Sequence, residues 1–316
     1  MNLPIETEDL GKRYGDVRAV EHLSLRVAEG EIYAFLGLNG AGKTTTIRML
    51  LGMIKPTSGY AKVLQTRVRI GNREPWESVG YMVEDPHAYP ELTVYENLEV
   101  ARRLHPGTPS KAVGQIIERL GLGTYAHRRT GTLSHGNAQR LGLAKALIHN
   151  PKLLILDEPA NGLDPAGIVE IRALLLELIS NGGTVFMSSH ILAEVSRLAG
   201  RIGIIHQGHL LQELSTDELE QNRRRRLLLR ARDVEAAHRV LIAADQPAEI
   251  LHDGSVELKN ASSIEHPDDI NRLLVNAGIP PTQLIVEEEE LEQYFLRLVG
   301  MDGGQQNGED NRYDLD

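Results

Sequence analysis

The chain has 316 residues, of which 41% are hydrophobic and 25% are charged, and it contains no cysteine. These proportions are typical of a globular protein with one large domain, or a large and a small one, and they argue against a disordered or fibrous chain. The lack of cysteine excludes disulfides and thiolate metal sites, and a net charge of -10 predicts a surface that repels phosphate backbones, so we expect no nucleic-acid partner.

Strand patterns dominate the first part of the chain. Up to about residue 64, short apolar runs such as HLSLRV and EIYAFLG alternate with glycine-bearing turns, which predicts strands. The segment TTTIRMLL at residues 44–51 has helical spacing and ends before Gly52, and KPTSG at 55–59 is a turn. A strand, a glycine-rich loop and a helix therefore follow one another here.

The middle of the chain changes to helical spacing. Apolar residues recur every three or four positions between residues 92 and 121, which predicts an inserted helical part at about 88–150. The next segments are an apolar run at 152–159, a helical pattern at 168–180, a strand pattern at 183–190 and a second helical pattern at 191–199. This alternation predicts parallel strands with crossover helices and a first domain over residues 1–214.

A second, smaller cycle begins after a polar, helix-like stretch at about residue 215. We expect helices at residues 233–243 and 266–278. The strand patterns lie at 225–231, 248–254, 255–260 and 282–290. Together these predict a compact α+β domain over residues 215–300, followed by a disordered tail at 301–316 that has no apolar periodicity.

The sequence GLNGAGKTT at residues 37–45 has the spacing G-x-x-x-x-G-K-[ST] between an expected strand and an expected helix. Glycines let backbone amides turn inward around phosphates, the Lys43 ammonium adds positive charge, and the Thr44 hydroxyl can reach Mg²⁺. An incidental glycine turn is the alternative, and the strand and helix on either side argue against it. The expected phosphate-binding residues are Gly37, Asn39, Gly40, Ala41, Gly42, Lys43, Thr44 and Thr45.

Two adjacent carboxylates end the apolar run LLILDEP at residues 153–159. Ligands gather at this edge of such sheets, so we expect Asp157 to hold Mg²⁺ and Glu158 to orient and polarise an attacking water in a phosphoryl transfer. Taken alone, an apolar strand that ends in Asp-Glu is as often a strand that simply reaches solvent. Its position downstream of a phosphate loop favours the functional interpretation.

The segment LSHGNAQRLGLAKAL at residues 133–147 resembles the signature segment of ABC ATPases, which other phosphate-loop enzymes lack. Standing alone, Leu-Ser-x-Gly would simply be a helix N-cap. The resemblance extends over about residues 5–212, because further family elements occur in order. Tyr14 matches the aromatic residue that stacks on adenine, residues 161–164 match the D-loop, and His190 matches the switch histidine.

This resemblance implies an α/β fold: a phosphate-loop ABC ATPase core with an antiparallel β subdomain and a helical insertion, followed here by the small C-terminal α+β domain. ATP and Mg²⁺ are the implied cofactors. The family's head-to-tail dimer implies that Ser134 and Gly136 cap the γ-phosphate of the ATP on the opposite subunit. Asp164 of the D-loop is a further expected nucleotide-binding residue.

The expected catalytic residues are Lys43, Glu158 and His190. The resemblance implies that His190 hydrogen-bonds the γ-phosphate and holds the water and Glu158 in place. Without the other motifs, a histidine at a strand end is more often an ordinary surface residue, and Tyr14 could be a core or turn aromatic.

Two segments depart from the family pattern. The signature reads LSHGN, with His135 and Asn137 where the family usually has glycine and glutamine, so activity in both sites of a dimer is not implied. The segment at 79–98 resembles the Q-loop region but carries Glu84 where glutamine is common. A carboxylate can still ligate Mg²⁺, so we expect Glu84 as a metal ligand beside Thr44 and Asp157, a variant that resembles exporters of drugs, bacteriocins or lipids.

One basic run, at residues 223–226, has two interpretations. It could bind phosphate, anionic lipid or RNA. The alternative is structural, because these arginines enter an expected strand and the acidic run at 287–290 of the same small domain could face them. We favour the structural interpretation.

Three functions are compatible with these motifs: a transporter motor, an ABC ATPase that acts on ribosomes or DNA, and a non-hydrolytic clamp. A single ATPase domain argues against the second, and Glu158 with His190 argues against the third. No secretion signal or membrane span is present, so we expect a peripheral protein on the cytoplasmic face of the membrane. Its expected partners are a second ATPase subunit, identical or different, and a separate polytopic membrane subunit that selects the cargo.

Overall fold

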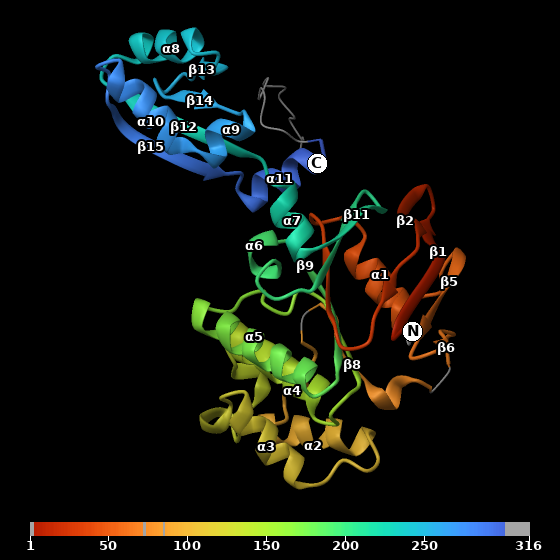
Figure 1. Cartoon of the computed structure of the whole chain (residues 1–316). Helices are drawn as coiled ribbons and strands as arrows, with labels where there is room; N and C mark the ends of the chain where they lie inside the picture. Colours follow the sequence, from red (N-terminus) through yellow and green to blue (C-terminus); the bar gives the residue numbers. More distant parts are fainter. Residues whose placement is uncertain (1–2, 72–73, 85, 301–316) are drawn as a thin grey trace, which may run out of the picture. The chain divides into compact units, whose positions relative to one another are not determined.

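The computed structural model of the chain describes residues 3–71, 74–84 and 86–300. The chain forms two compact units that divide between Glu218 and Leu219, and each has its own hydrophobic core (Figure 1). The tail predicted at 301–316 lies outside the described residues. Among the helices of the described part, none has the length and apolar character needed to cross a bilayer.

The first unit contains an antiparallel sheet in the order β2-β1-β5-β6, with β3 paired to β1. Its strands are short and turn-linked, as the alternating runs up to residue 64 predict. Their bounds are Ile5–Tyr14 for β1, Val17–Leu23 for β2, Arg26–Val27 for β3, Ser58–Val63 for β5 and Thr66–Arg67 for β6.

A second, six-stranded sheet of this unit has the order β11-β10-β4-β9-β8-β7 and is parallel except for β11. Its central strands are buried along their whole length, which is why they read as continuous apolar runs. The strands are Ile32–Leu36 (β4), Val79–Met82 (β7), Leu153–Leu156 (β8), Thr184–Ser189 (β9), Arg201–His206 (β10) and His209–Ser215 (β11).

The main core of the first unit lies between the two sheets. It joins Leu10 and Val20 of the antiparallel sheet to Phe35 and Phe186 of the parallel sheet. The ring of Phe186 also stacks on Tyr33, with ring centroids 5.5 Å apart. This packing fixes the position of the loop that leaves β4.

Helices complete the first unit, and α2, α3 and α4 lie together between β7 and β8 in the chain (Figure 1). The helices are Lys43–Leu50 (α1), Val94–Leu104 (α2), Lys111–Arg119 (α3), His135–Leu147 (α4), Pro165–Ser180 (α5) and Leu192–Val195 (α6). Short 3-10 turns occur at Trp76–Ser78, Gly123–Tyr125 and Thr130–Thr132. Helices α2, α3 and α4 lie within residues 88–150, the part that the sequence predicts as a helical insertion.

One helix is shorter than predicted. The pattern at 191–199 predicts a continuous helix, but α6 ends at Val195. Beyond Val195 the chain continues as turns, with the Ala199 amide donating to the Val195 carbonyl at 2.8 Å. The Gly200 amide then donates to the Ile32 carbonyl of β4, 3.0 Å away, and β10 begins at Arg201.

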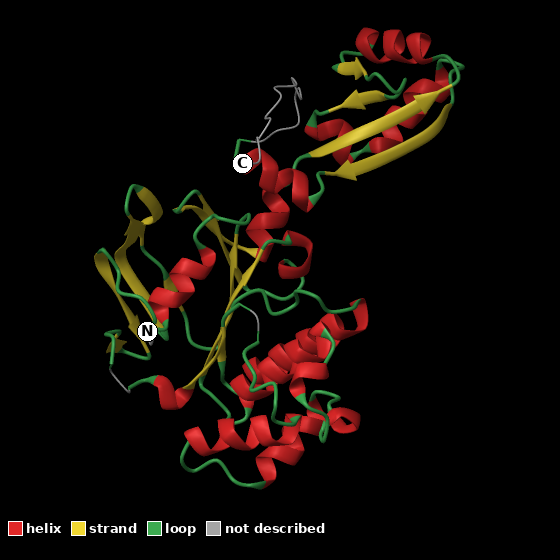
Figure 2. Ribbon diagram, turned by 180° about the vertical axis from the view of Figure 1, so that it is seen from behind, coloured by secondary structure: helices red, strands yellow, loops and turns green. Residues whose placement is uncertain are grey.

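The second unit has a sheet in the order β13-β14-β12-β15, with α8 and α10 packed on one face (Figures 1 and 2). Its strands are Arg225–Ala231 (β12), Ala248–Ile250 (β13), Val256–Leu258 (β14) and Pro281–Glu288 (β15). The helices are Val234–Ala243 (α8), Ala261–Glu265 (α9), Pro267–Asn276 (α10) and Leu291–Leu298 (α11), and α7 at Thr216–Asn222 spans the division. Leu227 and Leu229 of β12 form its core with residues of both packed helices.

The basic run of the second unit is paired with acidic residues inside the sheet. Arg225 and Arg226 lie opposite Glu288 and Glu287 on the antiparallel strand β15, and the Arg226 guanidinium is 2.7 Å from Glu287. Arg226 also contacts the buried carboxylate of Glu257, 3.1 Å away. These contacts support the structural interpretation of residues 223–226.

Candidate functional site

Three neighbouring strands bring the predicted site residues to one edge of the parallel sheet. β4, β9 and β8 lie side by side and point in the same direction, so their carboxyl ends meet. The glycine-rich loop leaves β4, His190 follows β9, and Asp157 follows β8. This arrangement joins residues as far apart in sequence as Thr44 and Asp157.

The glycine-rich loop at residues 37–42 has the backbone of a phosphate cradle. Gly40 and Gly42 have φ values of 80° and 109°, which favour glycine, and α1 begins at once with Lys43. A Cβ on Gly37 would lie 2.6 Å from the Ile205 carbonyl. No side chain caps the first turn of α1, so its amide groups point at the loop, the arrangement that binds anions at helix N-termini.

Lys43 is buried beneath this loop, with 6% of its surface exposed. Its ammonium donates to the carbonyls of Gly37, at 2.6 Å, and Leu38, at 3.2 Å, and forms an ion pair with Glu158 at 3.2 Å. A buried ammonium with these partners is held in place, and it carries a positive charge to the centre of the cradle.

Thr44 and Asp157 form the second contact across the site. The Thr44 hydroxyl donates to one oxygen of the Asp157 carboxylate at 2.8 Å, and the Ser188 hydroxyl donates to the other at 2.6 Å. Asp157 is only 3% exposed. Proteins usually bind Mg²⁺ through one or two side-chain oxygens, while phosphate oxygens and water complete its coordination. A buried carboxylate beside a hydroxyl supplies oxygens of this kind, so these residues fit the ion.

Glu158 lies between the two other predicted catalytic groups. One oxygen of its carboxylate is 3.2 Å from Lys43, and the other is 2.8 Å from His190 Nδ1. Its backbone has φ of 50°, a left-handed conformation that costs roughly 1–2 kcal/mol for a residue with a Cβ. Strain of this kind concentrates at functional sites, where the surrounding structure enforces it.

Glu84 has the same left-handed backbone, with φ of 56°. Its carboxylate is half exposed and forms an ion pair with Arg48 of α1 at 2.6 Å. Glu84 also borders a cleft of about 390 Å³, lined by Thr44, Glu84, His87, His135, Gln139, Asp157, Glu158 and Asn161. Of the three predicted metal ligands, Thr44 and Asp157 are in contact, whereas Glu84 faces the same cleft but pairs with Arg48.

The remaining predicted residues lie apart from this cluster in the single chain. Tyr14 ends β1, is 46% exposed, and has the Lys12 ammonium 4.9 Å from its ring centroid. Ser134 is the exposed N-cap of α4, beside Gly136, and its hydroxyl accepts from the Asn137 amide. Asp164 is the N-cap of α5.

Asp164 and the hairpin that carries Tyr14 each make a structural contact of their own. The Asp164 carboxylate accepts a hydrogen bond from the Gly167 amide at 3.0 Å. Strand β2, which pairs with the end of β1, passes close to the phosphate loop. The approach is so close that a Cβ on Gly42 would lie 2.5 Å from the carbonyl oxygen of Ala19 in β2. Tyr14 is therefore on the hairpin beside the loop, while Asn39 and Gly40 are exposed on the loop itself.

Sequence reasoning missed two residues that contact the site. Ser188 lies within the apolar strand β9, and Gln139 lies in α4 among apolar residues. Both side chains are buried, Gln139 with 3% of its surface exposed. The available signal was a polar residue inside a buried element, because such a group needs a hydrogen-bond partner.

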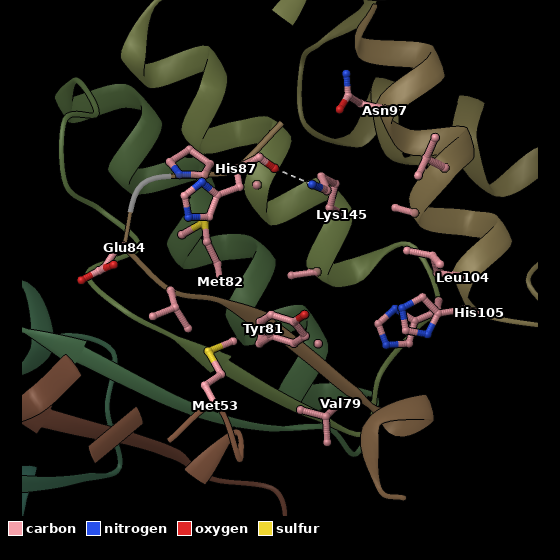
Figure 3. A pocket seen from close by; sticks show the side chains of 18 of the residues that line it. Met53, Val79, Tyr81, Met82, Glu84, His87, Asn97, Leu104, His105 and Lys145 are labelled. Atoms are coloured by element: carbon pink, nitrogen blue, oxygen red, sulfur yellow. Dashed lines mark hydrogen bonds between the residues drawn. The ribbon is translucent and has the colours of Figure 1, made fainter. Parts of the chain in front are cut away.

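A second pocket of about 490 Å³ adjoins Glu84 on the side of the helical insertion (Figure 3). Met53, Tyr81 and Met82 are among its apolar lining, and Lys145 of α4 donates to the His87 carbonyl. Burial lowers the pKa of the Lys145 ammonium. The pocket thus combines an apolar wall with several polar and charged groups, among them Arg48, His87 and Lys145.

Two histidines close one end of this second pocket. The rings of His105 and His149 stack with centroids 3.6 Å apart. Burial, and then the neighbouring His105, lowers the pKa of His149 to about 4. Burial also lowers the pKa of His105. Both shifts favour the neutral form of the rings.

Comparison with known proteins assigns a family to this site. The ABC transporter family matches residues 20–161. The bacitracin transport ATP-binding protein BcrA of Bacillus licheniformis is 40% identical over 305 residues, covering 95% of this chain and 98% of that protein. The lantibiotic transport ATP-binding protein SrtF of Streptococcus pyogenes is 37% identical over 216 residues, covering 68% of this chain and 93% of that protein.

Solved structures agree with this assignment. The ATP-binding subunit of an ABC transporter superposes with a TM-score of 0.64 and 28% identity, covering 69% of this chain and 92% of that one. The family and the fold class predicted from the signature segment are confirmed. The chain therefore belongs to the ABC transporter family, as an ATP-binding subunit that hydrolyses ATP to power transport through a separate membrane component.

Proposed function

We propose that ATP hydrolysis takes place where β4, β8 and β9 end, through Lys43, Glu158 and His190. The observation that carries this proposal is the position of the Glu158 carboxylate between the Lys43 ammonium and the His190 imidazole. Glu158 can accept a hydrogen bond from the attacking water and orient it, while Lys43 neutralises charge that develops on the transferred phosphate. His190 keeps the carboxylate in position.

Thr44 and Asp157 are the residues that would hold Mg²⁺, and Glu84 is the third candidate ligand. Bound Mg²⁺ supplies neutralisation of phosphate charge. The hydrogen bond between the Thr44 hydroxyl and the buried Asp157 carboxylate supports this assignment, because both residues line the same cleft. Glu84 borders the same cleft, but its carboxylate is paired with Arg48. This ion pair would have to break before Glu84 could bind the metal ion.

The active form we propose is a dimer of ATPase subunits, identical or different, with two ATP molecules at the interface. Ser134 and Gly136 would contact the nucleotide of the opposite subunit, because in the single chain they lie at the exposed N-terminus of α4 rather than on the phosphate loop. Tyr14 would stack on adenine from the hairpin beside the loop, and Asp164 would contribute from the N-terminus of α5.

The transport system we propose is an exporter of a peptide antibiotic, with this chain bound to the cytoplasmic face of the membrane through a polytopic subunit. The similarity to a bacitracin transport protein covers 95% of the chain, so it includes most of the second unit as well as the site. The pocket in Figure 3 adjoins Glu84 and offers that subunit an apolar surface.

Two measurements test this proposal. Affinity purification of the chain from membranes should recover a polytopic protein, and its absence would contradict the membrane partnership. Cells that express the chain with that partner should survive more bacitracin than cells that express the partner with Glu158→Gln. Equal survival would contradict a bacitracin-like cargo. The ATPase assignment is tested separately, by an ATPase assay on the purified chain.

A further inference from the structure

The backbone at Glu158 is held from more than one side. Its left-handed φ of 50° is disfavoured for a residue with a Cβ, so hydrogen bonds must maintain it. The Glu158 amide donates to the Ser188 hydroxyl at 2.9 Å, and the Glu158 carbonyl accepts from the Asn161 amide at 3.1 Å. The direction of the carboxylate therefore depends on the groups that fix these peptides.

Gln139 of α4 provides a further support from outside the turn. Its carboxamide nitrogen is 3.3 Å from the Glu158 carbonyl oxygen and 3.2 Å from the Pro159 carbonyl oxygen, so it donates to two consecutive peptides. The side chain is buried, and the other buried residues of α4 are apolar or glycine. Burial of an amide is costly unless its hydrogen bonds are made, and these two carbonyls satisfy it.

We propose that Gln139 is a positioning residue for ATP hydrolysis, which holds the left-handed turn at Glu158 so that the carboxylate stays between Lys43 and His190. This inference rests on the proposed catalytic role of Glu158. The two hydrogen bonds of the Gln139 amide go to backbone carbonyls, so it acts through the backbone of the catalytic residue.

A second contact ties the same helix to the same turn. The His135 ring, at the start of α4, lies directly against Gly162, where a Cβ would overlap it, and Gly162 has a φ of 74°. Residues 158–162 are thus held against the N-terminal turns of α4 at two points. The contact made by Gln139 is the polar one, and its hydrogen bonds determine the direction of the Glu158 and Pro159 carbonyls.

The first test replaces Gln139 with methionine, which has a similar length and no donor. Gln139→Met should lower kcat by roughly 10-fold to 100-fold, because a shift of about 1 Å in a catalytic group costs on the order of 100-fold. KM for ATP should change by less than about twofold, because Lys43 and Thr44 keep their contacts. ATPase assays on the purified full chain give both values.

A second variant separates positioning from packing. In Gln139→Glu the carboxylate repels both carbonyls, but the protonated acid can donate to one of them, and burial raises the pKa of that acid. The ratio of its kcat to the wild-type kcat should therefore rise as pH falls from about 8 to about 6. A residue that only fills space would give a ratio that does not change with pH.

The control is Leu147→Ala, a loss of buried packing near the other end of α4. It should lower the unfolding temperature and leave kcat per folded molecule unchanged. The inference is overturned if Gln139→Met keeps the wild-type kcat, or if Leu147→Ala lowers kcat as much. Glu158→Gln is assayed in parallel: wild-type turnover in that variant would remove the proposed function, whereas slow Glu158→Gln with fast Gln139→Met would remove only this inference.

Discussion

At the residue scale, the site is defined by a few polar contacts between segments distant in sequence. Lys43, Glu158 and His190 meet because three strands end at one edge, and the ion pair of Glu158 with Lys43 and its hydrogen bond with His190 select one direction for its carboxylate. The same geometry makes single substitutions informative, because binding and turnover depend on different members of the cluster.

Glu158→Gln keeps the shape of the side chain and removes its negative charge. We expect kcat for ATP hydrolysis to fall on the order of 100-fold or more, because a carboxylate that accepts a proton or orients water contributes at least that factor. ATP affinity should persist, since Lys43 and the loop amides are unchanged. Steady-state ATPase assays and nucleotide titration measure the two quantities, and undiminished turnover would contradict the role of Glu158.

Glu84→Ala removes the partner of Arg48 and the third candidate metal ligand. The ion pair is exposed, so the free energy of unfolding should change by no more than about 0.5 kcal/mol. ATP affinity should be retained through Lys43, Thr44 and Asp157, but stimulation of the ATPase by the membrane subunit should be lost. Full stimulation of the variant by the purified partner would identify Glu84 as an ordinary surface carboxylate.

At the scale of elements, helix caps fix where the insertion begins. Thr93 caps α2, and a reciprocal bond from its amide to the Glu96 carboxylate completes a capping box. Loss of such a cap costs about 1 kcal/mol, so Thr93→Ala should lower the free energy of unfolding by that amount. Urea unfolding measures it, with the exposed Thr124→Ala as the control.

The effect of this cap should depend on pH. The backbone amide of Thr93, and then its hydroxyl, lower the pKa of Glu96. A carboxyl with a lowered folded-state pKa adds stability above its unfolded pKa and loses it as pH falls through the folded value. Thr93→Ala keeps the backbone amide and removes the hydroxyl, so the difference in unfolding free energy between wild type and Thr93→Ala should shrink in acid by the share that the hydroxyl contributes. An unchanged difference would show that the bond between the hydroxyl and the Glu96 carboxylate takes no part.

Elements were also the level at which sequence prediction worked and failed most clearly. The central strands, α1, α8 and α10 follow from apolar spacing, whereas α9 and α11 of the second unit were not predicted. The predicted helix at 191–199 is regular only to Val195 and continues as turns to Leu198. The Gly200 amide then pairs with the Ile32 carbonyl of β4, and a local pattern cannot report a hydrogen bond to a residue more than 160 positions away.

At the scale of the whole molecule, two separate cores predict two unfolding events. We expect ATP to bind the unit that carries the phosphate loop, so saturating ATP should raise one transition temperature. At about 100 times the Kd the stabilisation is about 2.7 kcal/mol, or roughly 5 to 10 °C for a unit of this size. Calorimetry of the full chain with and without ATP makes the measurement.

Lys43→Ala is the control for this experiment, because it removes the buried cation of the phosphate cradle. The ATP-induced shift should disappear in this variant, while the transition of the second unit stays where it was. A shift of both transitions by ATP would contradict the assignment of the nucleotide to the first unit alone.

The sequence by itself determined the family and the fold class, and it predicted which residues do the chemistry. The glycine-rich loop, the Asp-Glu pair after an apolar strand and the signature segment are short, contiguous patterns whose conformations depend on neighbouring residues. The tertiary structure decided how they meet. The order β4-β9-β8 places Glu158 between Lys43 and His190. Packing of the segments beside these strands pairs Glu84 with Arg48 and holds Gln139 against the Glu158 turn. These contacts depend on strand pairing and core packing between distant segments, which no local pattern contains.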